Sequence, residues 1–192
     1  ASAATGVVTI NTTAVNVAFN GLTVKTGSAN DTITLAQKAT VDAGAGDDTI
    51  TVSAFGGTLT GGAGKDTFDV KAAAAGTALT EAAGIVKTTI TAVDAGDTII
   101  FSGKGTEVFN KLQVNVSTAA NLDDALALAL AGDGNTNGIV NWFQYAGNTY
   151  LVEDTATGGT VAATDLVVKI NGLVDLTNST FVDGATGILT IA

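Results

Sequence analysis

The sequence is organised by the stretch Gly44-Ala45-Gly46-Asp47-Asp48-Thr49-Ile50-Thr51, because related stretches lie on both sides of it at a spacing of 17 or 18 residues. Five columns of equivalent residues agree across the three copies: Gly27, Gly44 and Gly62; Asp31, Asp48 and Asp66; Ile33, Ile50 and Phe68; Leu35, Val52 and Val70; and, half a period away, Val24, Val41 and Leu59. Agreement in this many columns indicates an internal repeat.

Each copy consists of a six-residue turn followed by a short strand, in the pattern G-G-x-G-x-D-x-U-x, where U is a large apolar residue. Glycine is needed where the backbone adopts a positive φ. In the strand, Ile50 and Val52 face one side, whereas Thr49 and Thr51 face the other. A chain that returns to an equivalent position about every 18 residues predicts a mainly β fold, a parallel β-roll or β-solenoid with two short strands and two loops per turn.

The aspartate column predicts a cation site. Stacking of the turns brings Asp31, Asp48 and Asp66 close together along one edge. Two carboxylates ~4 Å apart repel by about 1 kcal/mol in water and by several near a protein surface, so this edge is unfavourable without a cation. Carboxylate and carbonyl oxygens, in a chain without His or Cys, favour Ca²⁺ over zinc or copper. The opposite loops, 37–40 and 54–57, lack the aspartate, so calcium is expected along one edge only.

Segments 44–50 and 61–68 resemble the RTX calcium-binding repeats of bacterial proteins exported by type I secretion. The resemblance implies one calcium ion between loops 27–31 and 44–48 and a second between loops 44–48 and 62–66, held by aspartate side chains and loop carbonyl groups. Asp48 would then be the only aspartate shared by both ions. The implied metal-site residues are Gly27, Ala29, Asp31, Gly44, Gly46, Asp47, Asp48, Gly62, Gly64, Lys65 and Asp66.

A later segment, Asp94-Ala95-Gly96-Asp97, resembles the degenerate closing turn of RTX domains. In that interpretation Asp97 completes a further calcium site. The same residues are equally consistent with an ordinary turn before a strand.

The composition excludes several classes of function. The net charge of −10 arises from 15 Asp and 3 Glu against 8 Lys, with no Arg, which argues against nucleic-acid binding. Without His and Cys, the chain cannot form a Ser-His or Cys-His nucleophile pair, and the three glutamates share no motif, so we do not expect an enzyme. No apolar run approaches the ~20 residues that a membrane-spanning helix needs.

The flanking regions predict a β-rich chain on either side of the repeat. Residues 1–25 are expected to form strands, with Val17 and Phe19 aligned with Ile33 and Leu35 as an earlier, metal-free turn. The calcium β-roll is assigned to residues 26–101, with a short helix near 79–83 after its repeats. Residues 102–192 are expected to form a β-rich cap with one short helix, beginning at Ser117 or Thr118 and ending at Ala131, and a hairpin turning at 147–148.

The cap resembles the C-terminal caps of RTX domains in surface-layer proteins and secreted proteases. This resemblance implies that the tail 181–192 is a secretion signal read by an ABC exporter and that the protein is extracellular, on a bacterial surface. We therefore expect a calcium-dependent structural module that self-associates in a surface lattice, with cell-surface polysaccharide as a partner through the parent chain. The first alternative is an accessory RTX domain of a secreted enzyme, of the protease or lipase type, or of an adhesin.

Ice binding is the second alternative. The outward threonines of the repeat form ladders of the kind found on ice-binding solenoids, namely Thr32, Thr49 and Thr67 in one and Thr34 and Thr51 in the other. The sequence supplies only three turns, and Asp69 interrupts the second ladder. Threonine also suits exposed strand positions in general, so this alternative is the weaker one.

Overall fold

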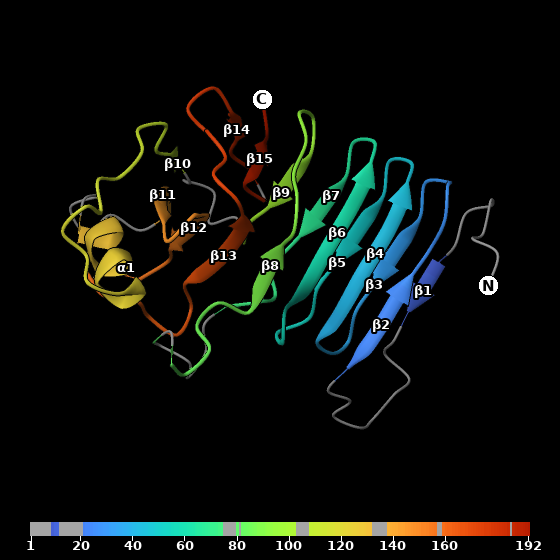
Figure 1. Cartoon of the computed structure of the whole chain (residues 1–192), viewed down its shortest axis with the longest axis horizontal. Helices are drawn as coiled ribbons and strands as arrows, with labels where there is room; N and C mark the ends of the chain where they lie inside the picture. The colour runs from blue at the N-terminus through green and yellow to red at the C-terminus, as the bar shows by residue number, and fades with distance from the viewer. Residues whose placement is uncertain are drawn as a thin grey trace.

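The protein is mainly β. The computed structural model describes residues 9–11, 21–74, 80, 82–102, 108–131, 138–156, 159–184 and 186–192. Their strands form a seven-stranded and an eight-stranded sheet, and the described helix, α1, lies at the opposite end of the sheets from β1 and β2 (Figure 1). None of the described residues belongs to a helix with the length and apolar character needed to cross a bilayer.

The two sheets take the repeat strands alternately. In spatial order, the seven-stranded sheet contains β1 (Thr9–Asn11), β3 (Thr32–Thr34), β5 (Thr49–Thr51), β7 (Thr67–Asp69), β9 (Thr98–Ile100), β15 (Ile188–Thr190) and β14 (Thr180–Val182). The eight-stranded sheet contains β10 (Val108–Phe109), β11 (Ile139–Tyr145), β12 (Asn148–Asp154), β13 (Leu166–Asn171), β8 (Thr88–Ile90), β6 (Gly57–Ala63), β4 (Ala39–Ala45) and β2 (Leu22–Lys25). From β2 to β9 consecutive strands alternate between the sheets, and neighbours within each sheet are parallel.

The predicted apolar columns are confirmed by the strand register. Ile33 pairs with Ile50 and Ile50 with Phe68 in one sheet, while Val24, Val41 and Leu59 are in register in the other. Both columns continue into the next strands, through Ile99 and Ile90 respectively. These side chains face inward and are almost entirely buried between the sheets. Burial of each such side chain contributes about 1.5–3 kcal/mol, so the columns form the principal hydrophobic core.

The turn of each repeat is shorter than the sequence pattern suggested. β4 continues as far as Ala45 and β6 as far as Ala63, so Gly44 and Gly62 pair within the sheet rather than in a loop. Gly44 nevertheless has φ of +107° and Gly62 of +115°, a conformation that glycine adopts without steric cost. Positive φ was therefore predicted correctly for Gly44 and Gly62, whereas the boundary between strand and turn was not.

The N-terminal alignment predicted from sequence is wrong. β1 pairs with β3 so that Ile10, not Val17, is in register with Ile33. Val17 and Phe19 themselves lie outside the described residues. The sequence spacing between Ile10 and Ile33 is 23 residues rather than 17 or 18, so the first stack is not recognisable from the period alone.

The cap continues both sheets of the repeat. β13 is parallel to β8, whereas β15 is antiparallel to β9 and places the C-terminal tail inside the seven-stranded sheet. Leu189 of β15 is fully buried and belongs to the same core as the repeat columns. The repeat and the cap therefore share one core.

Helix α1 (Leu122–Ala131) begins later than Ser117 or Thr118, the expected start. Its N-cap is Asn121, whose side-chain oxygen accepts a hydrogen bond from the Asp124 N–H at 2.9 Å. The buried residues of α1 follow helical spacing and pack against β11, β12 and β13; they are Leu122, Ala125, Leu126, Ala129 and Leu130. The short helix expected near 79–83 falls partly outside the described residues, and residues 82–84 form a turn.

The hairpin between β11 and β12 turns at Ala146-Gly147, one residue earlier than expected. Ala146 has φ of +47° and Gly147 has φ of +78°, the signs required at both central positions of a type I′ turn. A left-handed conformation costs an L-residue such as alanine roughly 1–2 kcal/mol, and asparagine tolerates it better.

We expect Ala146→Asn to stabilise the protein by about 0.5–1 kcal/mol, because Asn-Gly is the preferred pair in this turn. Urea denaturation followed by circular dichroism measures the change. Gly147→Ala is the matched variant and should destabilise the protein, since it places a side chain at positive φ where none is present. If both substitutions left the urea midpoint unchanged, the turn would not carry the inferred backbone strain.

Candidate metal site: a buried aspartate column

The equivalent aspartates of the repeat are buried side by side along one edge of the molecule. The exposed fraction is 2% for Asp31, 1% for Asp48 and 1% for Asp66. Each precedes the short strand of its copy, and the register of β3, β5 and β7 aligns the residues that follow them. The sequence-predicted column is thus brought together by the structure.

Asp97 is the fourth member of this column. It lies 31 residues after Asp66, but β9 pairs with β7 so that Thr98 is in register with Thr67. Asp97 is 2% exposed, as buried as the other three. The longer spacing reflects the extra residues between β7 and β8. The column therefore has two interior members, Asp48 and Asp66, and Asp97, one of the metal-site residues predicted from sequence, is its last member.

A ladder of hydrogen bonds connects the column. The backbone N–H of Asp31 donates to Oδ1 of Asp48 at 2.7 Å, and the N–H of Asp48 donates to Oδ1 of Asp66 at 2.9 Å. The N–H of Asp66 donates in the same way to Oδ1 of Asp97 at 2.8 Å. Each carboxylate thus holds the turn that precedes it, and the charge-assisted bonds fix the stacking distance.

The second oxygen of both interior carboxylates has no protein partner. Oδ2 of Asp48 and Oδ2 of Asp66 are buried and accept no hydrogen bond. In Asp31 and Asp97, the end members, Oδ2 accepts a backbone N–H from Gly27 and Asp94 respectively. A buried carboxylate oxygen without a donor is costly, so the interior positions of the column are chemically incomplete.

Electrostatics within the column oppose ionisation. Burial raises the pKa of Asp66 to about 6, and the neighbouring carboxylates of Asp97 and Asp48 add to the rise, against the stabilising hydrogen bond from the Asp48 N–H. Burial likewise raises the pKa of Asp48, with Asp31 adding to it, and burial raises the pKa of Asp97. A nearby cation would reverse these effects, since opposite charge favours the ionised form.

Glycines allow the turns to stack closely beside the column. A Cβ at Gly44 would overlap the carbonyl oxygen of Gly27, and one at Gly62 would overlap that of Gly44. Similarly, a Cβ at Gly64 would overlap the carbonyl oxygen of Gly46. The carbonyl oxygens of one turn therefore lie directly against the backbone of the next, in the space that a side chain would fill.

Gly46 and Ala29 are related in the same way, because a Cβ at Gly46 would lie 2.6 Å from the carbonyl carbon of Ala29. Ala29 stands where the other copies have glycine, and no preceding described turn requires that space. The implied metal-site residues Gly27, Ala29, Gly44, Gly46, Gly62 and Gly64 are thus all found where one turn meets the next.

Asp47 and Lys65 are placed differently from the column. Their side chains are exposed, and they form a second ladder in which the Asp47 N–H donates to Asn30 Oδ1 at 2.9 Å and the Lys65 N–H donates to Asp47 Oδ1 at 2.8 Å. The side chains of Asn30 and Asp47 therefore join successive turns on the outer side, and Lys65 contributes its backbone N–H to this ladder. Asn30 occupies the column of Asp47 but is not among the metal-site residues predicted from the sequence.

Side chains alone do not form a metal centre here. Among the described residues, no group of three or more acidic side chains converges in a way that could hold an ion. The aspartates are instead spread along the stack, one for each turn. A cation at this edge would therefore need backbone carbonyl oxygens in addition to carboxylates, which is a ligand set suited to Ca²⁺.

The sequence matches no protein-family model and no curated protein. The chemistry of the site is therefore inferred from its geometry and composition.

We expect the metal-free protein to lose stability as the pH rises from about 4 to about 7. The pKa of Asp66 is about 6 in the folded chain, whereas an unperturbed aspartate has a pKa of 3.8. Between these values the folded chain binds more protons than the unfolded chain, so the free energy of unfolding falls as the pH rises. Thermal denaturation after removal of divalent cations measures this dependence.

Asp66→Asn is the control for this pH dependence. The variant keeps an oxygen that can accept the Asp48 N–H but has no charge, so its melting temperature should fall less between about pH 4.5 and about pH 7.5. Parallel pH profiles for the wild type and Asp66→Asn would contradict the assignment of a raised pKa to this carboxyl.

Proposed function

We propose that the protein is a calcium-dependent structural module, a parallel β-roll whose turns are joined by Ca²⁺ along the aspartate column. The observation that carries this proposal is the pair of buried, unpartnered oxygens, Asp48 Oδ2 and Asp66 Oδ2, in a stack of four carboxylates. Such a stack is unfavourable as long as its charges are not offset. The same module resembles the RTX repeats of proteins exported by type I secretion.

The residues present fit this ion. Carboxylates of Asp31, Asp48, Asp66 and Asp97 would supply the charged ligands, and carbonyl oxygens of Gly27, Ala29, Gly44 and Gly46 lie where one turn meets the next. Hard oxygen donors of these two kinds are the preferred ligands of Ca²⁺, and the chain has no His or Cys to favour a softer metal. A bound ion would supply the positive charge that the column lacks.

Calcium is expected to drive folding of the repeat. Extracellular sites of this type have Kd of about 10⁻⁴–10⁻³ M, so each should add about 1.4 kcal/mol to the free energy of unfolding at a tenfold excess of calcium over Kd. Thermal denaturation and circular dichroism, with chelator and then with millimolar Ca²⁺, measure this effect. A melting temperature and β spectrum that do not respond to calcium would refute the proposal.

Variants of the column separate calcium binding from general stability. Asp48→Asn and Asp66→Asn should each weaken calcium binding more than Asp31→Asn, because they lie between two neighbours. The same two variants should stabilise the calcium-free protein, since each removes a buried charge. Asp42→Asn is the matched control: Asp42 is in an exposed pair with Lys25, a contact worth at most about 1 kcal/mol. Equal calcium midpoints for all four variants would contradict the stacked sites.

A role at the bacterial surface follows from the same proposal. Cytosolic calcium is far below the affinity range given above, so the chain would leave the cell unfolded and fold outside. The tail 181–192 would be read by the exporter before folding, because in the folded protein β15 is buried within the seven-stranded sheet. Outside the cell the module would support self-association in a surface lattice or serve as the accessory domain of a secreted enzyme or adhesin.

A specific observation also favours ice binding as a second candidate function. Threonines from all strands of the seven-stranded sheet are in register, namely Thr9, Thr32, Thr49, Thr67, Thr98, Thr190 and Thr180. The objection that the ladder has only three members is therefore wrong. Asp69 does interrupt the second ladder, as expected, because it pairs with Thr51.

The geometry of this threonine column suits an ordered, uncharged partner. Adjacent strands are spaced by about 4.7–4.9 Å, so hydroxyl and methyl groups recur at regular intervals. The side chains from Thr32 onward are exposed or half-exposed. The opposite sheet carries a shorter column, Thr23, Thr40, Thr58 and Thr89, which Lys169 ends.

Ice binding predicts thermal hysteresis or inhibition of ice recrystallisation by the calcium-loaded protein. Thr49→Lys, on an interior strand of the seven-stranded sheet, should abolish this activity because it interrupts the array with a large charged group. Thr118→Lys, an exposed position in the loop before α1, should retain it. Absence of activity in the folded wild type would leave the threonine column as a structural feature, stabilised by cross-strand pairs such as the 3.0 Å hydrogen bond from Thr98 Oγ1 to Thr67 Oγ1.

A further inference from the structure

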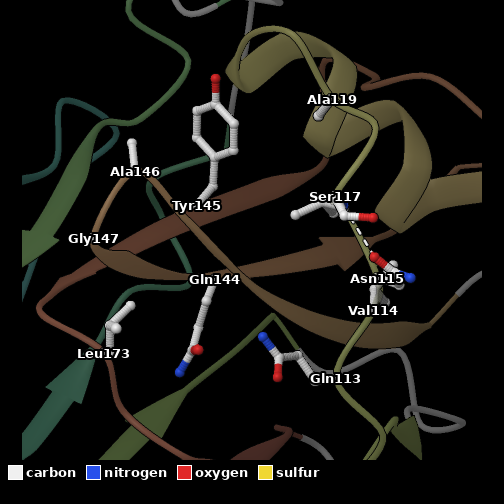
Figure 2. Close-up of a pocket in the computed structure, with 11 residues that line it drawn as sticks. Gln113, Val114, Asn115, Ser117, Ala119, Gln144, Tyr145, Ala146, Gly147 and Leu173 are labelled. Atoms are coloured by element: carbon white, nitrogen blue, oxygen red, sulfur yellow. Dashed lines mark hydrogen bonds between the residues drawn. The ribbon is translucent and has the colours of Figure 1, made fainter.

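We propose that a cleft in the cap binds a neutral saccharide. The cleft lies between residues 113–119 and the end of β11 and has a volume of about 590 Å³, within the range of sites for small molecules. Its lining includes Gln113, Asn115, Ser117, Gln144, Tyr145 and Leu173 (Figure 2). It is separate from the aspartate column and does not depend on which function the column serves.

The cleft forms where one segment leaves the edge of a sheet. Residues 110–114 run beside β11, with the Asn110 N–H bonded to the Val140 carbonyl and the Val114 N–H bonded to the Trp142 carbonyl. Beyond Val114, a turn in which the Ser117 N–H donates to Asn115 Oδ1 at 3.0 Å redirects the chain toward α1. The space between the diverging segment and the end of β11 stays open.

The lining has hydrogen-bonding groups but no charge. None of the cleft residues is Asp, Glu or Lys, although the chain carries a net charge of −10. A metal ion, a phosphate or a charged peptide would find no opposite charge to offset its desolvation. Amide and hydroxyl groups, by contrast, match the alternating donors and acceptors of sugar hydroxyls.

Two glutamine amides are available to a ligand. Gln144 donates from Nε2 to the Val174 carbonyl at 3.1 Å, which holds its amide in place while leaving Oε1 and one N–H for a further partner. Figure 2 shows Gln113 extending toward Gln144 across the lower part of the cleft, with Leu173 beyond Gln144. The Gln113 amide has no hydrogen-bond partner among the described residues. Together the two amides can pair with neighbouring hydroxyl groups of one ring.

Apolar surface completes the complementarity to a sugar ring. Leu173 is 65% exposed at the cleft wall, beside Gln144, whereas the Tyr145 ring points away from the two glutamine amides (Figure 2). The C–H faces of a pyranose are apolar and can lie against Leu173 while the hydroxyls reach the amides. An extended peptide is a poorer fit. The edge of β11 is covered by residues 110–114 as far as the hydrogen bond from the Val114 N–H to the Trp142 carbonyl, and the few residues of β11 after Trp142 are too short an edge for an added strand.

Saturation-transfer NMR on the calcium-loaded protein, with glucose, galactose, mannose and N-acetylglucosamine as probes, tests the proposal. We expect transfer to at least one sugar, with a Kd in the millimolar range, and binding about tenfold weaker in Gln113→Ala, as the loss of a pair of hydrogen bonds implies. Gln113 is exposed, so this variant leaves the fold intact. Gln144→Leu should weaken binding as well, and Asn178→Ala, an exposed amide in a turn away from the cleft, should not.

Three results would overturn the saccharide assignment. The first is the absence of transfer to all four sugars in a protein shown by circular dichroism to be folded. The second is transfer that is unchanged in both glutamine variants, since binding would then occur elsewhere. The third is stronger binding of a neutral extended peptide or of inorganic phosphate, added as competitors, because the cleft would then recognise a different chemistry.

Discussion

The stacking of four buried carboxylates is the constraint on which the rest of this structure depends. Asp48, Asp66 and Asp97 each accept a backbone N–H from the preceding turn, so the turns are held together by the same groups that repel one another. Burial and the neighbouring carboxylates raise the pKa of Asp48, Asp66 and Asp97, so their ionised forms are unfavourable in the stack. Protons or cations that reduce the charge would stabilise this edge, which links the structure of the repeat to its ionic environment.

Two features allow the turns to approach closely enough for this ladder. Glycines such as Gly44 and Gly62 leave room for the carbonyl groups of the preceding turn and adopt the positive φ that the path requires. On the inner side, the columns of Ile50 and Val41 bury apolar surface at the same spacing. Hydrophobic burial thus favours the stack while repulsion between the carboxylates opposes it, and the proposed calcium ions would reduce this repulsion.

The outer surfaces have a different chemistry from the edge. The seven-stranded sheet presents a column of threonines, and the cap presents a cleft lined by amides and hydroxyls. The threonine column and the cleft lining themselves carry no charged side chain, in an acidic chain. In a protein with a net charge of −10, contacts with neutral partners are most favourable at such areas, because neither charge repulsion nor loss of ion hydration opposes them.

The sequence by itself determined the repeat, the identity of its inward-facing residues and three members of the aspartate column. Equivalent positions of stacked turns have the same environment, so the same type of residue recurs at a constant sequence spacing. It named Asp97 as a candidate but left an ordinary turn equally open, and it did not determine Ile10 as the partner of Ile33, since insertions change the spacing while the strand register stays the same. The helix start at Asn121 and the cleft also needed the tertiary structure. Several residues could cap the helix, and the cleft depends on where two segments separate, which is set by packing across the sheet rather than by any local pattern.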